Sequence, residues 1–349
     1  MVSMPIDLAW FEGAVSVAPD EQGGLTPMRL PWAERALFDP GLLGNAGCAS
    51  GVRLRFATDA ERVALAFAPM PESWATGHHF DATIDGELIT SVPAPQGSES
   101  ATLELPAGEK TVEIWLPQGT WVTLRGLAVN DGASCRTVPD DRPKWVTYGS
   151  SITHCVRAHS PARTWPALLA RRHHLNLTSL GYGGQCHLET LMGLVIRDLP
   201  ADFISLKLGI NCIGGSLSPR TLPSQVVGLV RLIRERHPRT PIALISPIAY
   251  PPNETTPNMV GYTLQLMRDH IADAARRLID AGDEHLLYVD GMTIFDETLL
   301  AQYSDDQCHP GPDGMFVQAD RTDAAIMPYL LSGTVLAPGA TGRVGTGTG

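Results

Sequence analysis

Four short stretches in the C-terminal half of the sequence hold residue types that together could carry out acyl transfer on a serine. They supply a nucleophile, donors for an oxyanion, a base, and an acid that orients the base. In chain order they are Gly149-Ser150-Ser151-Ile152, Gly181-Tyr182-Gly183-Gly184, Gly209-Ile210-Asn211 and Asp306-Gln307-Cys308-His309-Pro310. Each stretch alone is weak evidence, but their order along the chain favours one shared site.

The nucleophile and its base are predicted from spacing. A serine hydroxyl reacts only when a base takes its proton, which His309 can do. Asp306 stands three residues earlier and can accept from the imidazole Nδ1–H, which leaves Nε2 facing Ser151. Ser150 is an alternative nucleophile and Asp305 an alternative acid. The spacing favours Ser151 and Asp306.

The oxyanion of a tetrahedral intermediate needs hydrogen-bond donors. We predict the backbone N–H groups of Ser151 and Gly184 and the side-chain amide of Asn211. Glycine at position 184 lets the backbone approach the oxyanion without a Cβ. The glycine turn could instead bind a nucleotide, but Cys186 stands where the dinucleotide fingerprint needs glycine. Asn211 could instead cap a helix.

The elements that must hold these stretches follow from the hydrophobic pattern after residue 143. Apolar runs alternate with amphipathic helices, which predicts a parallel sheet with helices on both faces. In such sheets, sites form beyond the carboxyl ends of the strands, and three of the four stretches begin where a predicted strand ends. The predicted strands are 145–148, 175–180, 203–208, 242–245 and 286–289, and the clearest helices cover 226–233 and 264–278.

The N-terminal part of the sequence has a different hydrophobic pattern. Short alternating runs such as 52–56, 62–67 and 111–114 predict strands, and Asp85-Gly86 predicts a hairpin turn. We therefore expect a β-sandwich over residues 1–136, a linker over 137–143, the catalytic domain over 144–331 and a disordered tail over 332–349.

Composition narrows the class of protein. The net charge of −11 argues against nucleic acid and against an anionic membrane surface as partners. We see no signal peptide and no membrane-length apolar run, and six unpaired-looking cysteines favour a reducing cytoplasm. Some cysteines and histidines lie within or beside the four stretches, but their spacing matches no metal motif, so we expect small apolar packing for these thiols. They are Cys155, Cys186, Cys212 and Cys308, with His154, His187 and His309.

The four stretches in this order resemble the GDSL, or SGNH, hydrolase family over roughly residues 141–331. The resemblance implies a three-layer α/β/α catalytic domain, a triad of Ser151, Asp306 and His309, and an oxyanion hole of Ser151, Gly184 and Asn211. Two positions depart from the family pattern, because Ser150 and Cys212 replace residues that are often Asp. The N-terminal domain resembles the accessory domains that precede some carbohydrate esterases.

The leading hypothesis is hydrolysis of a small acyl ester through a Ser151 acyl-enzyme, with no cofactor and no metal. The alternative is an acyltransferase that moves an acyl group from acyl-CoA or another ester or thioester to a natural-product hydroxyl. A carbohydrate-binding protein without catalysis is the third. The expected partner is a small-molecule ester or thioester, including glycosylated or polyketide-like ones, and the oligomeric state stays open.

Overall fold

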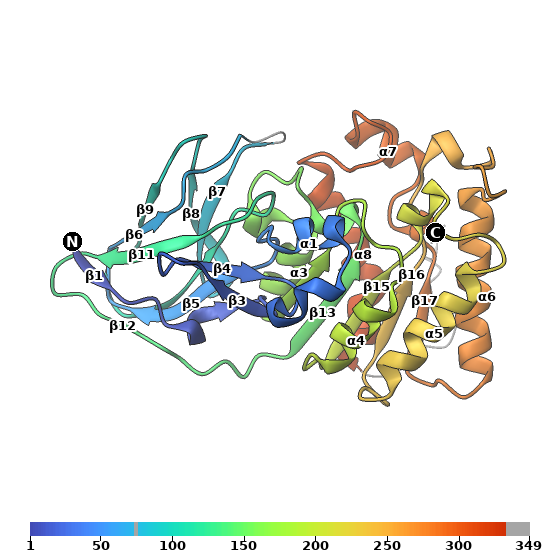
Figure 1. Ribbon diagram of the computed structural model, residues 1–349, viewed down its shortest axis with the longest axis horizontal. Coiled ribbons are helices and arrows are strands. Elements are labelled where there is room, and N and C mark those ends of the chain that lie inside the picture. Colours follow the sequence, from blue (N-terminus) through green and yellow to red (C-terminus); the bar gives the residue numbers. More distant parts are fainter. Residues whose placement is uncertain (73–75, 333–349) are drawn as a thin grey trace, which may run out of the picture.

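The chain folds into an N-terminal part with antiparallel strands and a C-terminal part with a parallel sheet (Figure 1). The computed structural model describes residues 1–72 and 76–332. Of the tail expected over 332–349, only Ser332 is described, as the last residue of a helix, and the rest lies outside the described residues. We call strands β1–β12 with their helices the N-terminal unit, and the elements from β13 onward the C-terminal unit.

The N-terminal unit has two antiparallel sheets. The first comprises, in spatial order, β3 (Ser16–Pro19), β4 (Leu25–Met28), β11 (Leu124–Val129), β6 (Arg62–Phe67) and β9 (Ser100–Glu104), with β1 (Val2–Met4) also paired with β11. The second comprises β12 (Cys135–Arg136), β5 (Arg53–Thr58), β10 (Lys110–Trp115), β7 (His79–Ile84) and β8 (Glu87–Pro93), with β2 (Phe11–Glu12) paired with β5.

The two antiparallel sheets share one hydrophobic core. Leu65 and Leu127 of the first sheet belong to the same buried cluster as Phe56 and Ile114 of the second. Alternate burial along the strands produces this arrangement, since successive side chains point to opposite faces of a sheet. The predicted hairpin is present between β7 and β8.

Helical segments also occur in the N-terminal unit, where the sequence analysis predicted only strands and a turn. They are η1 (Leu8–Trp10), η2 (Trp32–Leu37) and α1 (Pro40–Ala46). Asp39 caps α1 by accepting from the Gly41 N–H at 2.8 Å. The helix is too short for a recognisable hydrophobic period, which explains why the sequence pattern did not indicate it.

The parallel sheet of the C-terminal unit agrees closely with the predicted strands. In spatial order it comprises β14 (Asn176–Gly181), β13 (Lys144–Gly149), β15 (Phe203–Lys207), β16 (Ile242–Ile245) and β17 (Leu286–Val289). Because β14 and β15 flank β13, the carboxyl ends of the first three strands of the C-terminal unit lie side by side. These are the strand ends that precede three of the four stretches.

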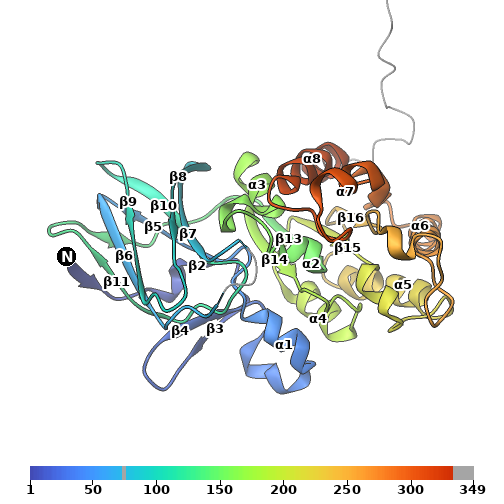
Figure 2. The same ribbon diagram turned by 90° about the horizontal axis from the view of Figure 1, so that it is seen from above.

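Helices cover both faces of this sheet (Figure 2). α3 (Trp165–Arg172) and α8 (Gly314–Ser332) pack together on one face. On the opposite face, α4 (Thr190–Asp198) packs against α5 (Leu222–Arg234), and α5 packs against α6 (Leu264–Asp280). The remaining helical segments are α2 (Ser151–His154), α7 (Glu297–Tyr303), η3 (Pro161–Arg163), η4 (Ile210–Gly214), η5 (Pro251–Asn253) and η6 (Gly291–Thr293).

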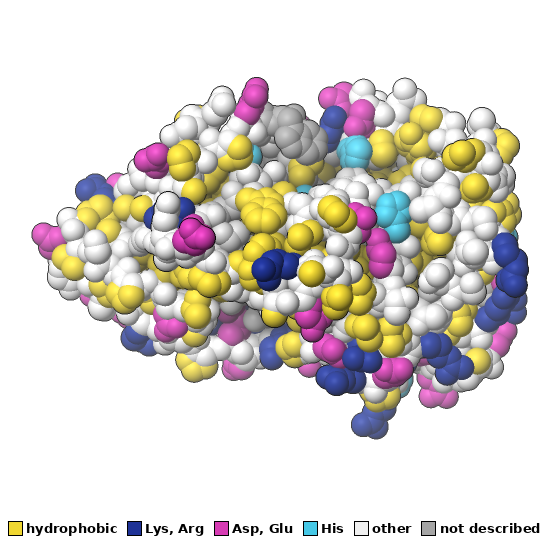
Figure 3. All heavy atoms as spheres, in the orientation of Figure 1, with side chains coloured by type: hydrophobic (Ala, Val, Ile, Leu, Met, Phe, Trp, Pro, Cys, Tyr) yellow, Lys and Arg dark blue, Asp and Glu magenta, His cyan; other side chains and the backbone are white. Residues whose placement is uncertain are grey.

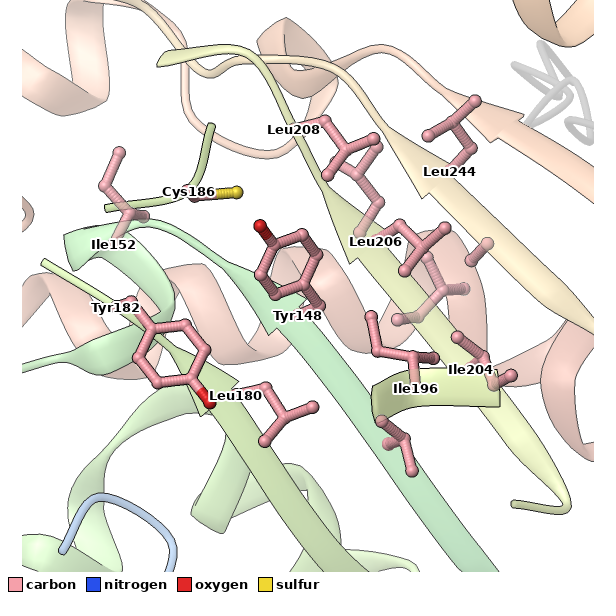
Figure 4. Close-up of a cluster of buried hydrophobic side chains, with 14 of the residues drawn as sticks. Tyr148, Ile152, Leu180, Tyr182, Cys186, Ile196, Ile204, Leu206, Leu208 and Leu244 are labelled. Atoms are coloured by element: carbon pink, nitrogen blue, oxygen red, sulfur yellow. The ribbon is translucent and has the colours of Figure 1, made fainter. Parts of the chain in front are cut away.

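The core beneath the strand ends is apolar with aromatic side chains. Tyr148 of β13 and Tyr182, which follows β14, meet edge to face with ring centroids 6.4 Å apart. Figure 4 shows them among Ile152, Cys186 and leucine and isoleucine side chains of the neighbouring strands. The Tyr182 hydroxyl donates to the Arg29 carbonyl at 2.6 Å. This packing gives the strand ends a rigid support.

Two buried arginines of the N-terminal unit join it to β14, which is an edge strand among the described strands of the sheet. Arg53 donates to the Leu177 carbonyl at 2.9 Å. Arg29 donates to the carbonyls of Ser179 at 3.1 Å and Gly181 at 2.5 Å. Alternate carbonyls of an edge strand would otherwise lack partners. The N-terminal unit therefore completes the hydrogen bonding of the strand that leads into the glycine turn.

None of the helices in the described part of the chain is both long and apolar enough to cross a membrane.

Candidate active site

Ser151 stands at the first position of α2, where strand β13 ends. Ser150 is fully buried and serves as the N-cap, since its Oγ accepts from the Ile152 N–H at 3.3 Å. A Cβ on Gly149 would lie 2.3 Å from Thr153 Oγ1, so the turn between strand and helix needs glycine there. Ser150 thus supplies the side-chain oxygen that caps this helix.

Ser151, His309 and Asp306 form a continuous chain of hydrogen bonds. Ser151 Oγ lies 2.8 Å from His309 Nε2, and His309 Nδ1 lies 2.7 Å from Asp306 Oδ2. The carboxylate can only accept, so Nδ1 carries the proton and Nε2 has a lone pair directed at the serine hydroxyl. The residues come from β13–α2 and from the loop between α7 and α8, as the sequence predicted.

Asp306 is held in its ionised form. Partial burial opposes ionisation, but hydrogen bonds from the backbone and ring of His309 and from the Cys308 N–H outweigh it, and together they lower the pKa of Asp306. Arg157 Nη2 lies 3.2 Å from the same carboxylate. Asp305, the alternative acid, forms an ion pair with Arg157 instead.

Cys308 is a second possible nucleophile beside the same histidine. Its Sγ lies 4.0 Å from His309 Nε2, which is longer than the 2.8 Å of the Ser151 Oγ contact. Burial raises the pKa of the Cys308 thiol to about 11, and the Asp306 charge adds to the effect. A thiol that stays protonated at neutral pH is a poor nucleophile, so the geometry favours Ser151.

The glycine turn after β14 lines the cavity and leaves one backbone N–H without an acceptor among the described residues. The other N–H groups of this turn all have acceptors. The Tyr182 N–H donates to the Gly149 carbonyl and the Gln185 N–H to the Tyr182 carbonyl. The Gly183 N–H donates to the side chains of Asn45 and His154, and the Cys186 N–H donates to Asn211 Oδ1. Among the described residues, none accepts from the Gly184 N–H. Gly184 has φ +69°, a conformation that suits glycine.

Asn211 lies within η4, whose N-cap is Gly209, so it does not cap that helix. Its Oδ1 accepts from the Cys186 N–H at 2.9 Å, which fixes the orientation of the amide. No described residue accepts from its Nδ2, which leaves that donor free beside the cavity. The Ser151 N–H, at the start of α2, is likewise bonded to no other described residue.

A cavity of about 640 Å³ joins these groups, and both units line it. Gly44, Asn45, Cys48 and Gly119 of the N-terminal unit face Ser151, Asn211 and His309 across it, and Val156, Ile210, Ile213 and Tyr250 supply apolar wall. On the face shown in Figure 3, hydrophobic side chains gather in the middle, where the two units meet. The sequence analysis named none of these lining residues of the N-terminal unit.

Three of the four cysteines predicted near the site pack as expected, whereas Cys308 is only partly buried and lines the cavity. Cys155, Cys186 and Cys212 are buried in the core of the C-terminal unit. In the part of the chain that the structure describes, no cluster of His, Cys, Asp and Glu side chains could hold a metal ion. His154 is instead hydrogen-bonded between the Gln118 carbonyl and the Gly183 N–H.

Comparison with known families identifies the class of protein. Residues 143–327 match the GDSL-like lipase/acylhydrolase family, and residues 9–125 match the family described as the SsfX3 N-terminal domain. The chain therefore belongs to the GDSL-like lipase/acylhydrolase family, and it is an ester-acting enzyme. Among curated proteins, none matches the chain significantly.

Solved structures resemble the whole chain. The salicylyl-acyltransferase SsfX3 from a tetracycline biosynthetic pathway is 33% identical, with a TM-score of 0.85 over 94% of this chain and 96% of that one. A protein of Bacteroides ovatus described as a GDSL-like lipase is 20% identical, with a TM-score of 0.76 over 95% and 98%. A family two carbohydrate esterase from Clostridium thermocellum is 16% identical, with a TM-score of 0.61 over 81% and 94%. The last two similarities, at 20% and 16% identity, show a shared fold only.

Proposed function

We propose that this protein is a serine acyl-transfer enzyme with Ser151 as nucleophile, His309 as base and Asp306 as the acid that orients it. The observation that carries the proposal is the chain of hydrogen bonds of 2.8 Å and 2.7 Å from Ser151 through His309 to Asp306 at the wall of a cavity. An intact triad of this kind also argues against a purely carbohydrate-binding role. The reaction needs no cofactor and no metal.

In the proposed reaction, Ser151 Oγ attacks the carbonyl carbon while His309 Nε2 takes the hydroxyl proton. The negative carbonyl oxygen accepts from the Ser151 N–H, the Gly184 N–H and Asn211 Nδ2, which are the donors left unused by other described residues. The tetrahedral intermediate then collapses, and His309 returns the proton to the departing alcohol or thiol. An acceptor hydroxyl attacks the acyl-enzyme by the same steps in reverse.

We further propose that the acceptor is a hydroxyl group of a small organic molecule, and that the acyl donor is an ester or thioester. The 33% identity to a salicylyl-acyltransferase extends over both units, which supports this choice. The cavity is within the size range of sites for drug-sized ligands, roughly 300–1,000 Å³, and much of its wall is apolar. Residues 1–136, as a β-sandwich domain, would help to present the substrate.

Hydrolysis is the second candidate, because the family description includes acylhydrolases and the acyl-enzyme is common to both reactions. The two candidates differ in what reaches the acyl carbonyl. A transferase must position its acceptor well enough to compete with water at ~55 M, which needs a large effective molarity.

A partitioning assay separates the two. The protein is supplied with p-nitrophenyl benzoate and with a panel of alcohols and phenols, and the new ester and free benzoate are quantified. For an acyltransferase, at least one acceptor should accelerate p-nitrophenol release and capture most acyl groups, and Ser151→Ala should abolish both effects. Free acid as the main product with every acceptor would identify a hydrolase.

The oxyanion assignment of Asn211 gives a separate prediction. Asn211→Ala should lower kcat by ~10²–10³-fold with little change in KM, because the oxyanion exists only after attack. Asn211→Asp keeps the acceptor for the Cys186 N–H but places a carboxylate where the donor stood, so it should be at least as inactive. Steady-state kinetics on an aryl ester test both variants. A raised KM with normal kcat would place Asn211 in substrate binding instead.

A further inference from the structure

The N-terminal unit reaches the glycine turn itself, and not only the rim of the cavity. The Gly183 N–H donates to Asn45 Oδ1 at 3.1 Å and to His154 Nδ1 at 3.3 Å. A Cβ on Gly183 would lie 3.2 Å from Asn45 Oδ1 and 3.8 Å from Ser151 Cβ. The turn is therefore held between the N-terminal unit and the nucleophile, one residue before the unused Gly184 N–H.

Asn45 is itself held in place. It lies on α1, where its Nδ2 donates to the Gly41 carbonyl at 3.1 Å. Its backbone carbonyl accepts from Arg29 at 2.7 Å, and the same guanidinium binds the Gly181 carbonyl at 2.5 Å. Arg29 thus joins the end of α1 to the end of β14, and Asn45 extends that link by two residues along the turn. A side chain fixed at both its amide atoms can impose a position on its partner.

His154 holds the same N–H from the opposite side. Its Nε2 lies 2.9 Å from the Gln118 carbonyl, which can only accept, so Nε2 carries the proton and Nδ1 accepts from Gly183. Burial, with the nearby Arg29 charge, lowers the pKa of His154 to about 3. The ring is therefore neutral at neutral pH and keeps the lone pair that this contact requires.

We propose that Asn45 and His154 are positioning residues that hold the glycine turn so that the Gly184 N–H points at the oxyanion. The N-terminal unit, through Asn45, Arg29 and Gln118, thereby belongs to the catalytic apparatus. This inference rests on the proposed function, because it assigns the Gly184 N–H to the transition state.

The size of the effect follows from preorganisation. Donors in an oxyanion hole act because they are fixed before charge develops, and a misplacement of about 1 Å can cost ~10²-fold in rate. Loss of one of two acceptors on the Gly183 N–H should leave the turn partly held. We therefore expect a loss of about tenfold or more in kcat from Asn45→Ala, at unchanged KM.

The test compares Asn45→Ala, His154→Ala, the double variant and His154→Gln with two matched controls. Asn130→Ala removes another side-chain acceptor of the N-terminal unit, which binds the N–H groups of Glu61 and Arg62. His237→Ala removes another buried histidine, near the amino end of β16 and away from the site. For each variant, kcat and KM for p-nitrophenyl acetate, the inhibition constant of phenylboronic acid and the melting temperature are measured.

If the proposal holds, Asn45→Ala and His154→Ala lower kcat and raise the inhibition constant of phenylboronic acid by similar factors. The reason is that the tetrahedral boronate accepts from the same oxyanion-hole donors as the transition state. Because each acceptor still holds the Gly183 N–H in part when the other is removed, the double variant loses more than the product of the single losses. His154→Gln, with an amide oxygen to accept and an NH₂ to donate, recovers part of the loss. Both controls keep kcat.

The proposal is overturned if kcat and boronate affinity in Asn45→Ala match those in Asn130→Ala, or if only KM rises. It is also overturned if the four variants and the two controls lose the same factor in kcat and the same amount in melting temperature, because the effect would then be a general loss of stability. Failure of the proposed function looks different, because wild type would then show no turnover that Ser151→Ala removes. Ser151-dependent turnover with an unaffected Asn45→Ala variant rejects the positioning role alone.

Discussion

Ser151→Ala is expected to lower kcat for an aryl ester by about 10⁶-fold, because no other group takes over the attack. The Ser151 hydroxyl lies 2.8 Å from His309 Nε2, whereas the Ser150 hydroxyl is buried and engaged with the Ile152 N–H. Loss of one hydroxyl at the cavity wall should leave the fold intact. Steady-state turnover and a thermal melt measure the two effects.

Ser150→Ala is the matched control for that substitution. It removes the N-cap of α2, which typically costs ~1 kcal/mol of stability, and it should keep most of the turnover. A fluorophosphonate probe followed by peptide mass spectrometry should find the label on Ser151. Labelling of Ser150, or of Cys308 by an acyl donor, would reject the assignment of the nucleophile.

The sequence predicted the C-terminal unit well because one physical rule connects its parts. Strands 145–148 and 203–208 are almost entirely buried, strand 175–180 alternates between partly buried and buried positions over its first half, and parallel strands must end at the same edge. A polar or glycine-rich stretch after each run was therefore enough to bring Ser151, Gly184 and Asn211 together. His309 could be added because Asp306 stands three residues before it.

The same reasoning could not find Arg29 or Asn45. Each acts through contacts with residues more than 100 positions away in the chain, and neither lies in a motif or a hydrophobic period. Asn45 lies on α1, a helix of seven residues that leaves no periodic signal. Arg29 binds backbone carbonyls that an edge strand would otherwise leave unpaired. The sequence does not show which strand lies at the edge of the sheet, because that depends on the strand order β14-β13-β15.

His154 is an intermediate case. Its position three residues after Ser151 was visible in the sequence, but a histidine beside cysteines also fits a metal ligand or core packing. Only the acceptor at Gln118 and the donor at Gly183 identify its protonated nitrogen. The role of a histidine near a nucleophile therefore cannot be read from the sequence alone, whereas its hydrogen-bond partners in the structure identify that role.

His309→Ala should be nearly as damaging as Ser151→Ala, and the double variant should be little worse than either. The serine is activated only while Nε2 can take its proton, so the two residues act as one unit and their losses do not add. Losses that multiply in the double variant would show that Ser151 reacts without His309. Single and double variants are compared by kcat/KM on the same aryl ester.

Asp306→Asn should be milder than His309→Ala, at about 10⁴-fold, because the base remains but loses the partner that fixes its tautomer. The hydrogen bonds that lower the pKa of Asp306 keep its carboxylate ionised at neutral pH, where it accepts from His309 Nδ1. Steady-state kinetics on the same aryl ester measure the loss, and a kcat/KM in Asp306→Asn equal to the wild-type value would show that the 2.7 Å contact between Asp306 and His309 does not govern the base.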